Sequence, residues 1–90
     1  MVLSKEFTLL NKTGLHARPA AILVKALSKF QSDIKIIYNG KEVNAKSFIS
    51  ITSLGIDKNS KIIVNTNGTD ADKAMQTIED LVNNKFGEKE

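Results

Sequence analysis

The stretch that decides the fold is Asp33-Ile34-Lys35-Ile36-Ile37-Tyr38-Asn39-Gly40-Lys41-Glu42-Val43, in the middle of a chain of 90 residues. Its first part, residues 33–38, is rich in β-branched and aromatic side chains, which favour strands. Asn39-Gly40 is a preferred pair for a two-residue turn, because both positions there adopt a positive φ. Pairing across this turn sets Ile36 opposite Val43 and gives the ribbon one apolar face. The stretch therefore predicts a β-hairpin.

Two amphipathic helices flank this hairpin. Before it, the apolar side chains of residues 19–30 recur at helical spacing, with lysine and serine on the other side. After it, the apolar side chains of residues 71–86 define a second long helix that is expected to stop near Gly87. Residues 69–72 resemble a capping box at the start of that helix. Each helix therefore has one row of apolar side chains that must be buried against another element.

Two further strands are predicted. Residues 5–10 alternate, which places Phe7 and Leu9 on one face. Residues 61–66 contain an apolar run, which indicates an interior position in the sheet. These two strands and the hairpin together supply a sheet of four strands.

The segment between the hairpin and the last strand is ambiguous from its residues alone. Alternation at Ile49 and Ile51 favours a strand. Ser47 as an N-cap and Gly55 as a stop favour a short helix instead. The local physics leaves these two alternatives even.

The order of elements predicts an α+β domain. Strands that alternate and helices that each bury one stripe are most economically combined as an antiparallel sheet with helices on one face. A right-handed crossover through the first helix, with the last strand filling the gap, predicts the sheet order 1-4-2-3. Without internal repeats or linkers, residues 1–90 are expected to form a single domain.

Composition narrows the classes of function. The net charge of +3 comes from scattered lysines, and the few aromatic residues do not cluster, so no nucleic-acid binding is expected. Cysteine is absent, which excludes disulfides and thiolate chemistry. No apolar run approaches the roughly 18 residues of a membrane span, so we expect no membrane insertion and a cytoplasmic protein.

The functional signal lies in residues 14–21, which hold the only histidine, arginine and proline of the chain. Either Arg18 caps the following helix and His16 lies just outside it, or His16 is the cap and Pro19 occupies the third helical position. A helix N-terminus favours anions, arginine matches phosphate, and neutral imidazole is a nucleophile. The stretch predicts a histidine that accepts a phosphoryl group. With one histidine and no cysteine, we expect neither a metal nor a cofactor.

Residues 11–20, 43–47 and 53–56 together resemble HPr, the histidine-containing phosphocarrier family of the bacterial phosphoenolpyruvate-dependent sugar phosphotransferase system. The Gly-Leu-His-Ala-Arg-Pro signature at residues 14–19 is specific, and the resemblance spans nearly the whole chain. It implies an open-faced β-sandwich with three helices on one face. It also implies that the ambiguous segment is a short helix beginning at Ser47.

The resemblance implies the chemistry as well. His16 would accept a phosphoryl group on Nδ1, as a pros-phosphohistidine, from phosphorylated enzyme I and donate it to a sugar-specific enzyme IIA. Arg18 and the helix start at Ala17 would assist by binding the phosphate oxygens. Such a protein is a carrier without turnover of its own, and a monomer suits a shuttle.

Ser47 matches the regulatory serine of Gram-positive members, which an HPr kinase/phosphorylase modifies and whose phosphoserine form acts with a catabolite control protein. A mainly regulatory protein acting through phospho-Ser47 is the alternative function. Ile49 and Thr52 stand where those members commonly have methionine, an adaptable docking residue. Apolar residues of this segment are core by default, although one or two could form a partner patch. The predicted docking residues are Ala20, Phe48, Ile49, Ile51 and Thr52.

Overall fold

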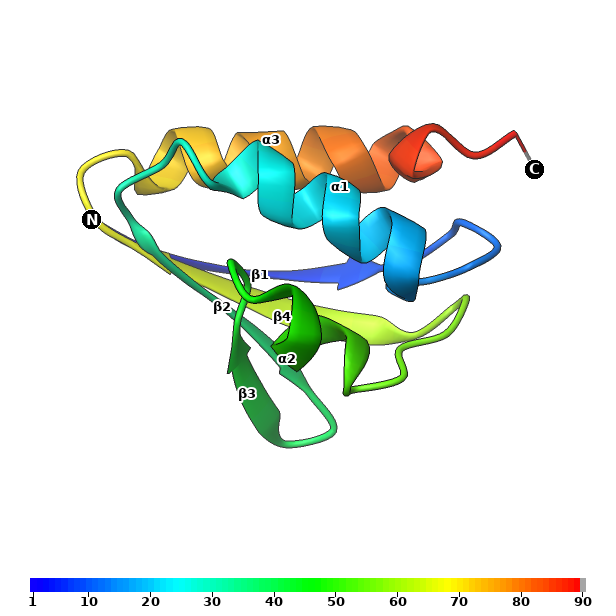
Figure 1. Cartoon of the computed structure of the whole chain (residues 1–90). Helices are drawn as coiled ribbons and strands as arrows, with labels where there is room; N and C mark the ends of the chain where they lie inside the picture. The colour runs from blue at the N-terminus through cyan, green and yellow to red at the C-terminus, as the bar shows by residue number, and fades with distance from the viewer. Residues whose placement is uncertain (90) are drawn as a thin grey trace.

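The computed structural model describes residues 1–89, which fold into a four-stranded antiparallel sheet with helices on one face (Figure 1). The strand order is β1-β4-β2-β3, which confirms the predicted topology. The elements are, in chain order, β1 (Val2–Thr8), α1 (Ala17–Leu27), β2 (Asp33–Tyr38), β3 (Lys41–Asn44), α2 (Phe48–Thr52), β4 (Lys61–Asn67), α3 (Ala71–Asn83) and a 3-10 turn, η1 (Lys85–Gly87). No helix within the described residues has the length and apolar character that crossing a membrane requires.

The hairpin of β2 and β3 forms as the sequence predicts. Ile36 pairs with Val43 across the ribbon. Both turn residues adopt a positive φ, 51° at Asn39 and 79° at Gly40, which is the geometry that a two-residue hairpin turn needs. The turn chemistry and the apolar pattern therefore agree on one register.

Strand β4 lies inside the sheet, paired with β1 on one side and β2 on the other. Its core face carries Ile62, Val64 and Thr66, all buried beneath the helices. Ile63 lies on the opposite face and is 39% exposed. The predicted interior position is right, but the apolar run is buried on one face only, because the sheet is open on the other.

Helix α1 begins at Ala17 with His16 as its N-cap, so the second of the two sequence alternatives holds. Pro19 is the third helical residue and is buried. The helix ends at Leu27, before Phe30, because the chain turns at Ser28, whose hydroxyl donates to the carbonyl of Lys25 at 2.8 Å. His16 is therefore tied directly to the start of a packed helix.

The predicted capping box before α3 is wrong. Asp70 is the N-cap residue but makes no side-chain hydrogen bond to its own helix. Its carboxylate instead accepts hydrogen bonds from the backbone N–H groups of Gln31 and Ser32 and from the Ser32 hydroxyl. These bonds, led by that from the hydroxyl, hold the pKa of Asp70 below its usual value. Asp70 therefore fixes the connection between α1 and β2.

The end of α3 also differs from the sequence prediction. The α-helix stops at Asn83, and Phe86 adopts a φ of 52° within the short turn η1. Phe86 still reaches the core, at 5% exposure, because the turn folds the chain back onto the domain. The C-terminal segment is thereby directed toward the loop that carries His16.

Segment 47–52 forms the short helix α2, as the resemblance implies, with Ser47 as its N-cap. Helix α2 contacts α1 and β3, and its Ile51 is fully buried in the core. The single core lies between sheet and helices, and its fully buried large apolar side chains are Leu9, Leu15, Leu27, Ile34, Ile36, Ile51, Ile56 and Val64.

Candidate functional site

The loop between β1 and α1 carries the only histidine and is held by its own hydrogen bonds. The side-chain amide of Asn11, which is 1% exposed, donates to the carbonyl of Gly14 at 2.8 Å. The Gly14 N–H donates back to the Asn11 carbonyl at 3.2 Å, and the His16 N–H donates to the Thr13 carbonyl at 3.1 Å. The loop thus presents His16 in one defined backbone conformation.

The same loop packs closely against the segment between α2 and β4. The Leu15 N–H donates to the Ile56 carbonyl at 3.0 Å. Gly14 has a φ of +57°, and a Cβ added there would lie 2.3 Å from the Ile56 oxygen and 2.9 Å from the Cα of Asp57. Only glycine fits both the backbone conformation and the available space.

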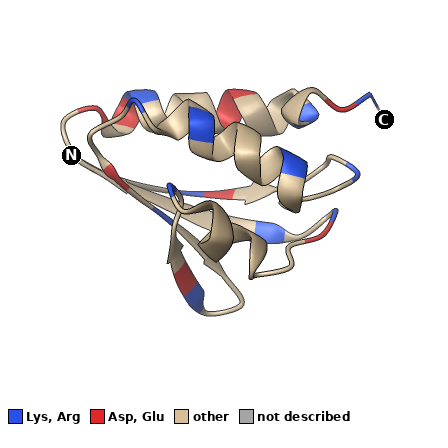
Figure 2. Ribbon diagram, viewed as in Figure 1, with Lys and Arg blue, Asp and Glu red and all other residues tan. Residues whose placement is uncertain are grey.

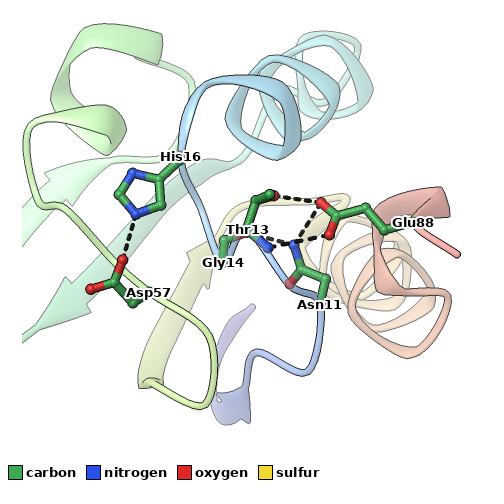
Figure 3. Close-up of polar contacts among 6 residues, drawn as sticks. All are labelled: Asn11, Thr13, Gly14, His16, Asp57 and Glu88. Atoms are coloured by element: carbon green, nitrogen blue, oxygen red, sulfur yellow. Dashed lines mark hydrogen bonds and ion pairs between the residues drawn. The ribbon is translucent and has the colours of Figure 1, made fainter. Parts of the chain in front are cut away.

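The imidazole ring of His16 is half exposed and makes one polar contact with the part of the chain that the structure describes. Its Nε2 lies 2.6 Å from Oδ1 of Asp57, and Figure 3 shows the other ring nitrogen on the side away from that carboxylate. Nδ1 has no hydrogen-bond partner among residues 1–89. The nitrogen that the resemblance marks as the phosphoryl acceptor is therefore open to an incoming group.

The N-terminus of α1 provides donors for an anion beside this ring. The His16 side chain does not cap the helix. The backbone N–H groups of Ala17 and Arg18 make no hydrogen bond within the described part of the chain, whereas that of Ala20 donates to the His16 carbonyl at 3.0 Å. Pro19 has no N–H. Two unpaired N–H groups at the positive end of the helix favour an anion.

A pocket of about 680 Å³ opens beside the histidine. It carries the cationic side chains of Lys12, Arg18 and Lys89. Within residues 1–89 the Arg18 guanidinium forms no hydrogen bond or ion pair, so its planar set of donors is available to a phosphate. The lining residues are Lys12, Thr13, His16, Ala17, Arg18, Phe86, Gly87, Glu88 and Lys89.

The C-terminal segment closes one side of this pocket through Glu88. Its carboxylate accepts hydrogen bonds from the Asn11 amide at 3.1 Å, from the Thr13 N–H at 3.2 Å and from the Thr13 hydroxyl (Figure 3). The hydrogen bond from that hydroxyl is the main reason that the pKa of Glu88 lies below its usual value. Glu88 therefore ties the chain end to the loop that carries His16.

Charge at this end of the molecule is mostly positive. Figure 2 shows basic positions in the first turn of α1, in both loops next to it and in the C-terminal segment, with acidic positions among them. The acidic Glu88 is already engaged by hydrogen-bond donors. The surroundings of His16 therefore favour a dianionic phosphoryl group over a neutral ligand.

The predicted second phosphorylation site, Ser47, is a working helix cap. Its hydroxyl oxygen accepts from the Ser50 N–H at 3.3 Å, and its proton is donated to the Ser50 hydroxyl at 2.9 Å. Ser47 is half-buried. The cap and a modification site are compatible, because a phosphate at a helix N-terminus is electrostatically favoured.

The predicted docking residues divide into two groups. Ile49 is 77% exposed and Phe48 is 40% exposed, so both present apolar surface, and Thr52 lies partly exposed beside them. Ala20 and Ile51 are fully buried against the core, so their side chains cannot contact a partner. Of the predicted docking residues, Phe48, Ile49 and Thr52 therefore present side-chain surface to solvent, whereas Ala20 and Ile51 do not.

Sequence reasoning missed three residues of the site: Asn11 as the loop anchor, Asp57 and Glu88. Asp57 and His16 are 41 residues apart, and Glu88 and Thr13 are 75 apart. Exposed acidic residues outside helices and strands leave no periodic signal in the sequence. No group of three or more histidine, cysteine or acidic side chains among residues 1–89 could hold a metal ion.

Comparison with known proteins agrees with this geometry. The family model "PTS HPr component phosphorylation site" matches residues 3–84. The match spans most of the chain and includes the loop, both long helices, strands β2, β3 and β4, and β1 from its second residue onward. The chain therefore belongs to the HPr family, the phosphocarriers of the sugar phosphotransferase system.

Similar solved structures also support membership of the HPr family. HPr of Thermoanaerobacter tengcongensis has a TM-score of 0.94 and 41% identity, with 98% of this chain and 99% of that chain covered. Phosphocarrier protein HPr of Bacillus anthracis has a TM-score of 0.87 and 41% identity, over 90% and 96%. Crh, a catabolite repression protein of Bacillus subtilis with a swapping domain in a dimer, has a TM-score of 0.73 and 35% identity, over 82% and 85%.

Proposed function

We propose that His16 accepts a phosphoryl group from phosphorylated enzyme I and passes it to a sugar-specific enzyme IIA. The observation that carries this proposal is the arrangement around Nδ1 at the N-terminus of α1, where neither Nδ1 nor the N–H groups of Ala17 and Arg18 have a hydrogen-bond partner among the described residues. A pocket with three cationic side chains opens next to it. The protein acts as a carrier and is itself the substrate of both partners.

In the proposed step, the Nδ1 lone pair attacks the phosphorus atom, and the bond from phosphorus to the donor breaks with its electron pair leaving on the donor. The two helix N–H groups and the Arg18 guanidinium bind the phosphoryl oxygens, where negative charge is concentrated. Arg18 provides a charge-assisted hydrogen bond worth about 1.5–3 kcal/mol before solvent screening. It assists the transfer, and the nucleophile is the imidazole.

Phe48, Ile49 and Thr52 are proposed to form part of the surface that meets both partners. Ile49 supports this role because a large apolar side chain 77% exposed loses unfavourable contact with water when a partner covers it. Helix α2 contacts α1, so a partner seated on α2 lies close to the helix that begins beside His16. The shuttle acts in the cytoplasm, where both partners are expected.

Regulation through Ser47 is the second proposed function. A kinase that uses ATP would transfer a phosphoryl group to the Ser47 hydroxyl, and the phosphoserine would act with a catabolite control protein. The likeness to Crh at 35% identity favours this role. A phosphate of about −1.5 to −2 charge placed at the start of α2 would change the sign of the docking surface while the fold survives. Weaker docking of enzyme I is the expected result.

The carrier role is tested by incubation with labelled phosphoenolpyruvate and enzyme I. We expect one label that is labile in acid and stable in base, and its loss in His16→Ala. Arg18→Ala should slow labelling about tenfold, since one charge-assisted contact is lost. Lys25→Ala is the matched control, because it removes a cation from the far end of the same helix. A label that persists in His16→Ala would contradict the assignment.

The regulatory role is tested with ATP and HPr kinase/phosphorylase. We expect an acid-stable label that disappears in Ser47→Ala and remains in Ser53→Ala, whose exposed hydroxyl lies at the other end of the same helix. Equal labelling of both variants, or none in the native chain beside a labelled Gram-positive HPr, would remove this function.

A further inference from the structure

The contact between His16 and Asp57 joins two segments that are distant in sequence. Oδ1 of Asp57 lies 2.6 Å from Nε2 of His16, within hydrogen-bond distance. The two side chains are 79% and 48% exposed, so the contact lies at the surface and is accessible to a phosphoryl donor. Figure 3 shows the carboxylate on the opposite side of the ring from Nδ1.

The backbones that carry these two side chains are fixed to each other. The Leu15 N–H donates to the Ile56 carbonyl at 3.0 Å, so the residues directly before His16 and Asp57 are hydrogen-bonded. Two more bonds join the same segments, from the Asn59 N–H to the Leu9 carbonyl at 2.7 Å and from the Leu9 N–H to Ser60 at 2.9 Å. Little backbone freedom is left to separate the pair.

The carboxylate decides which ring nitrogen carries the proton. An ionised carboxylate only accepts hydrogen bonds, so Nε2 must donate, and the neutral ring has a single N–H. The proton on Nε2 leaves the lone pair on Nδ1. We propose that Asp57 is a positioning residue for phosphoryl transfer, which holds His16 in the tautomer whose nucleophilic nitrogen is Nδ1. This inference rests on the proposed role of His16 as phosphoryl acceptor.

Asp57 also compensates the charge that forms during the step. The Nδ1 lone pair forms the N–P bond while the bond to the donor breaks and its electron pair leaves with the donor. The ring then carries a proton on Nε2 and a phosphoryl group on Nδ1, with one additional positive charge shared between the nitrogens. The carboxylate beside Nε2 offsets that charge. On onward transfer the N–P electrons return to Nδ1, and the Nε2 proton stays in place.

The cationic side chains of the pocket do not compete with His16 for the carboxylate of Asp57. Lys12, Arg18 and Lys89 line the pocket, and no ion pair within residues 1–89 links any of them to Asp57. Because the pair is exposed, the carboxylate is worth roughly a 1.4-fold to fivefold change in rate, the range that exposed ion pairs support. The tautomer should shift measurably even where the rate effect is modest.

The first test reads the ring directly in the full chain without any phosphoryl donor. In alkaline solution, where imidazole is neutral, long-range ¹H–¹⁵N spectra distinguish a protonated Nε2 from a protonated Nδ1. The native chain should show Nε2 protonated, and Asp57→Ala should shift the average toward the other tautomer. Asp57→Asn should stay near the native pattern, because its amide oxygen still accepts from Nε2. Asp33→Ala, an exposed change of equal charge on β2, should change nothing.

The second test measures the rate of His16 phosphorylation by phosphoramidate, a small donor that needs no docking surface. Asp57→Ala should be labelled roughly 1.4 to 5 times more slowly than the native chain, and Asp33→Ala at the native rate. An unchanged nitrogen spectrum together with an unchanged rate in Asp57→Ala would overturn the inference. Enzyme I could fail to label the native chain while Asp57→Ala still shifts the tautomer and slows phosphorylation by phosphoramidate. In that case the carrier role is contradicted and the action of Asp57 on the ring of His16 is supported.

Discussion

Replacing Gly14 by alanine tests how tightly the loop of His16 is seated. A Cβ at this position would lie 2.3 Å from the Ile56 oxygen and 2.7 Å from the carbonyl carbon of Asp57. Both neighbours are backbone atoms, so no side chain can rotate away to make room. The two segments would have to separate by about 1 Å to reach ordinary contact distance.

The cost has two parts. An alanine with a φ of +57° is strained by about 1–2 kcal/mol. Separation of the segments also weakens the 3.0 Å bond between Leu15 and Ile56, a further loss of about 1 kcal/mol, together with the packing around it. We expect a total of about 3 kcal/mol, against a stability of roughly 5–13 kcal/mol for a chain of this length.

Gly55→Ala is the matched control. Gly55 has nearly the same φ, +62°, but a Cβ there would meet nothing within 4 Å. Its cost should be the strain alone, about 1–2 kcal/mol. Urea unfolding followed by circular dichroism gives both values, and the difference between the variants isolates the contact between the segments. Equal destabilisation of the two variants would refute the close seating of the loop, and with it the fixed geometry of His16 and Asp57.

Three further predictions address the other contacts. Asp70→Asn should lower the melting temperature at neutral pH. Because the pKa of Asp70 in the folded chain lies below its ordinary value of 3.8, the ionised carboxylate stabilises the fold, and the native chain should lose this stabilisation as the pH falls below 3.8. Thermal unfolding at stepped pH measures both effects. Glu88→Gln should speed hydrogen exchange at the Thr13 amide at neutral pH, because the carboxylate that accepts from this amide is lost. The pKa of Glu88 is lowered in the folded chain, so its carboxylate stabilises the fold only while it is ionised. The difference in exchange rate between the variant and the native chain should therefore shrink as the pH falls below 4.5. Ile51→Val should lower the free energy of unfolding in urea by about 0.5–1.5 kcal/mol, because a buried methylene is removed. Ile49→Val, on the exposed side of the same helix, should leave it almost unchanged. Equal losses in the two variants would contradict the burial of Ile51.

The helix α2 is an element whose secondary structure could not be predicted from local sequence alone. Residues 47–55 fit a strand and a short helix equally well on propensity and capping. The structure forms the helix because Ser47 caps its first turn and Ile51 is fully buried in the core, while the helix as a whole contacts α1 and β3. The same packing buries Ala20 and Ile51, which the sequence had suggested as docking residues. Burial depends on neighbouring elements, and short-range patterns do not contain that information.

The sequence by itself predicted the β-hairpin, the two long helices and the sheet order, and it pointed to His16, with Arg18 beside it, as the proposed phosphoryl acceptor. The hairpin, the helices and the candidate site follow from turn residues, apolar periodicity and one specific motif, which are local signals, and the sheet order follows from the handedness rule for crossover connections. The tertiary structure alone decided that Asp57 meets His16 and that Glu88 meets Thr13, over separations of 41 and 75 residues. Contacts between exposed polar side chains depend on how loops from different elements pack together, so no local pattern in the chain encodes them.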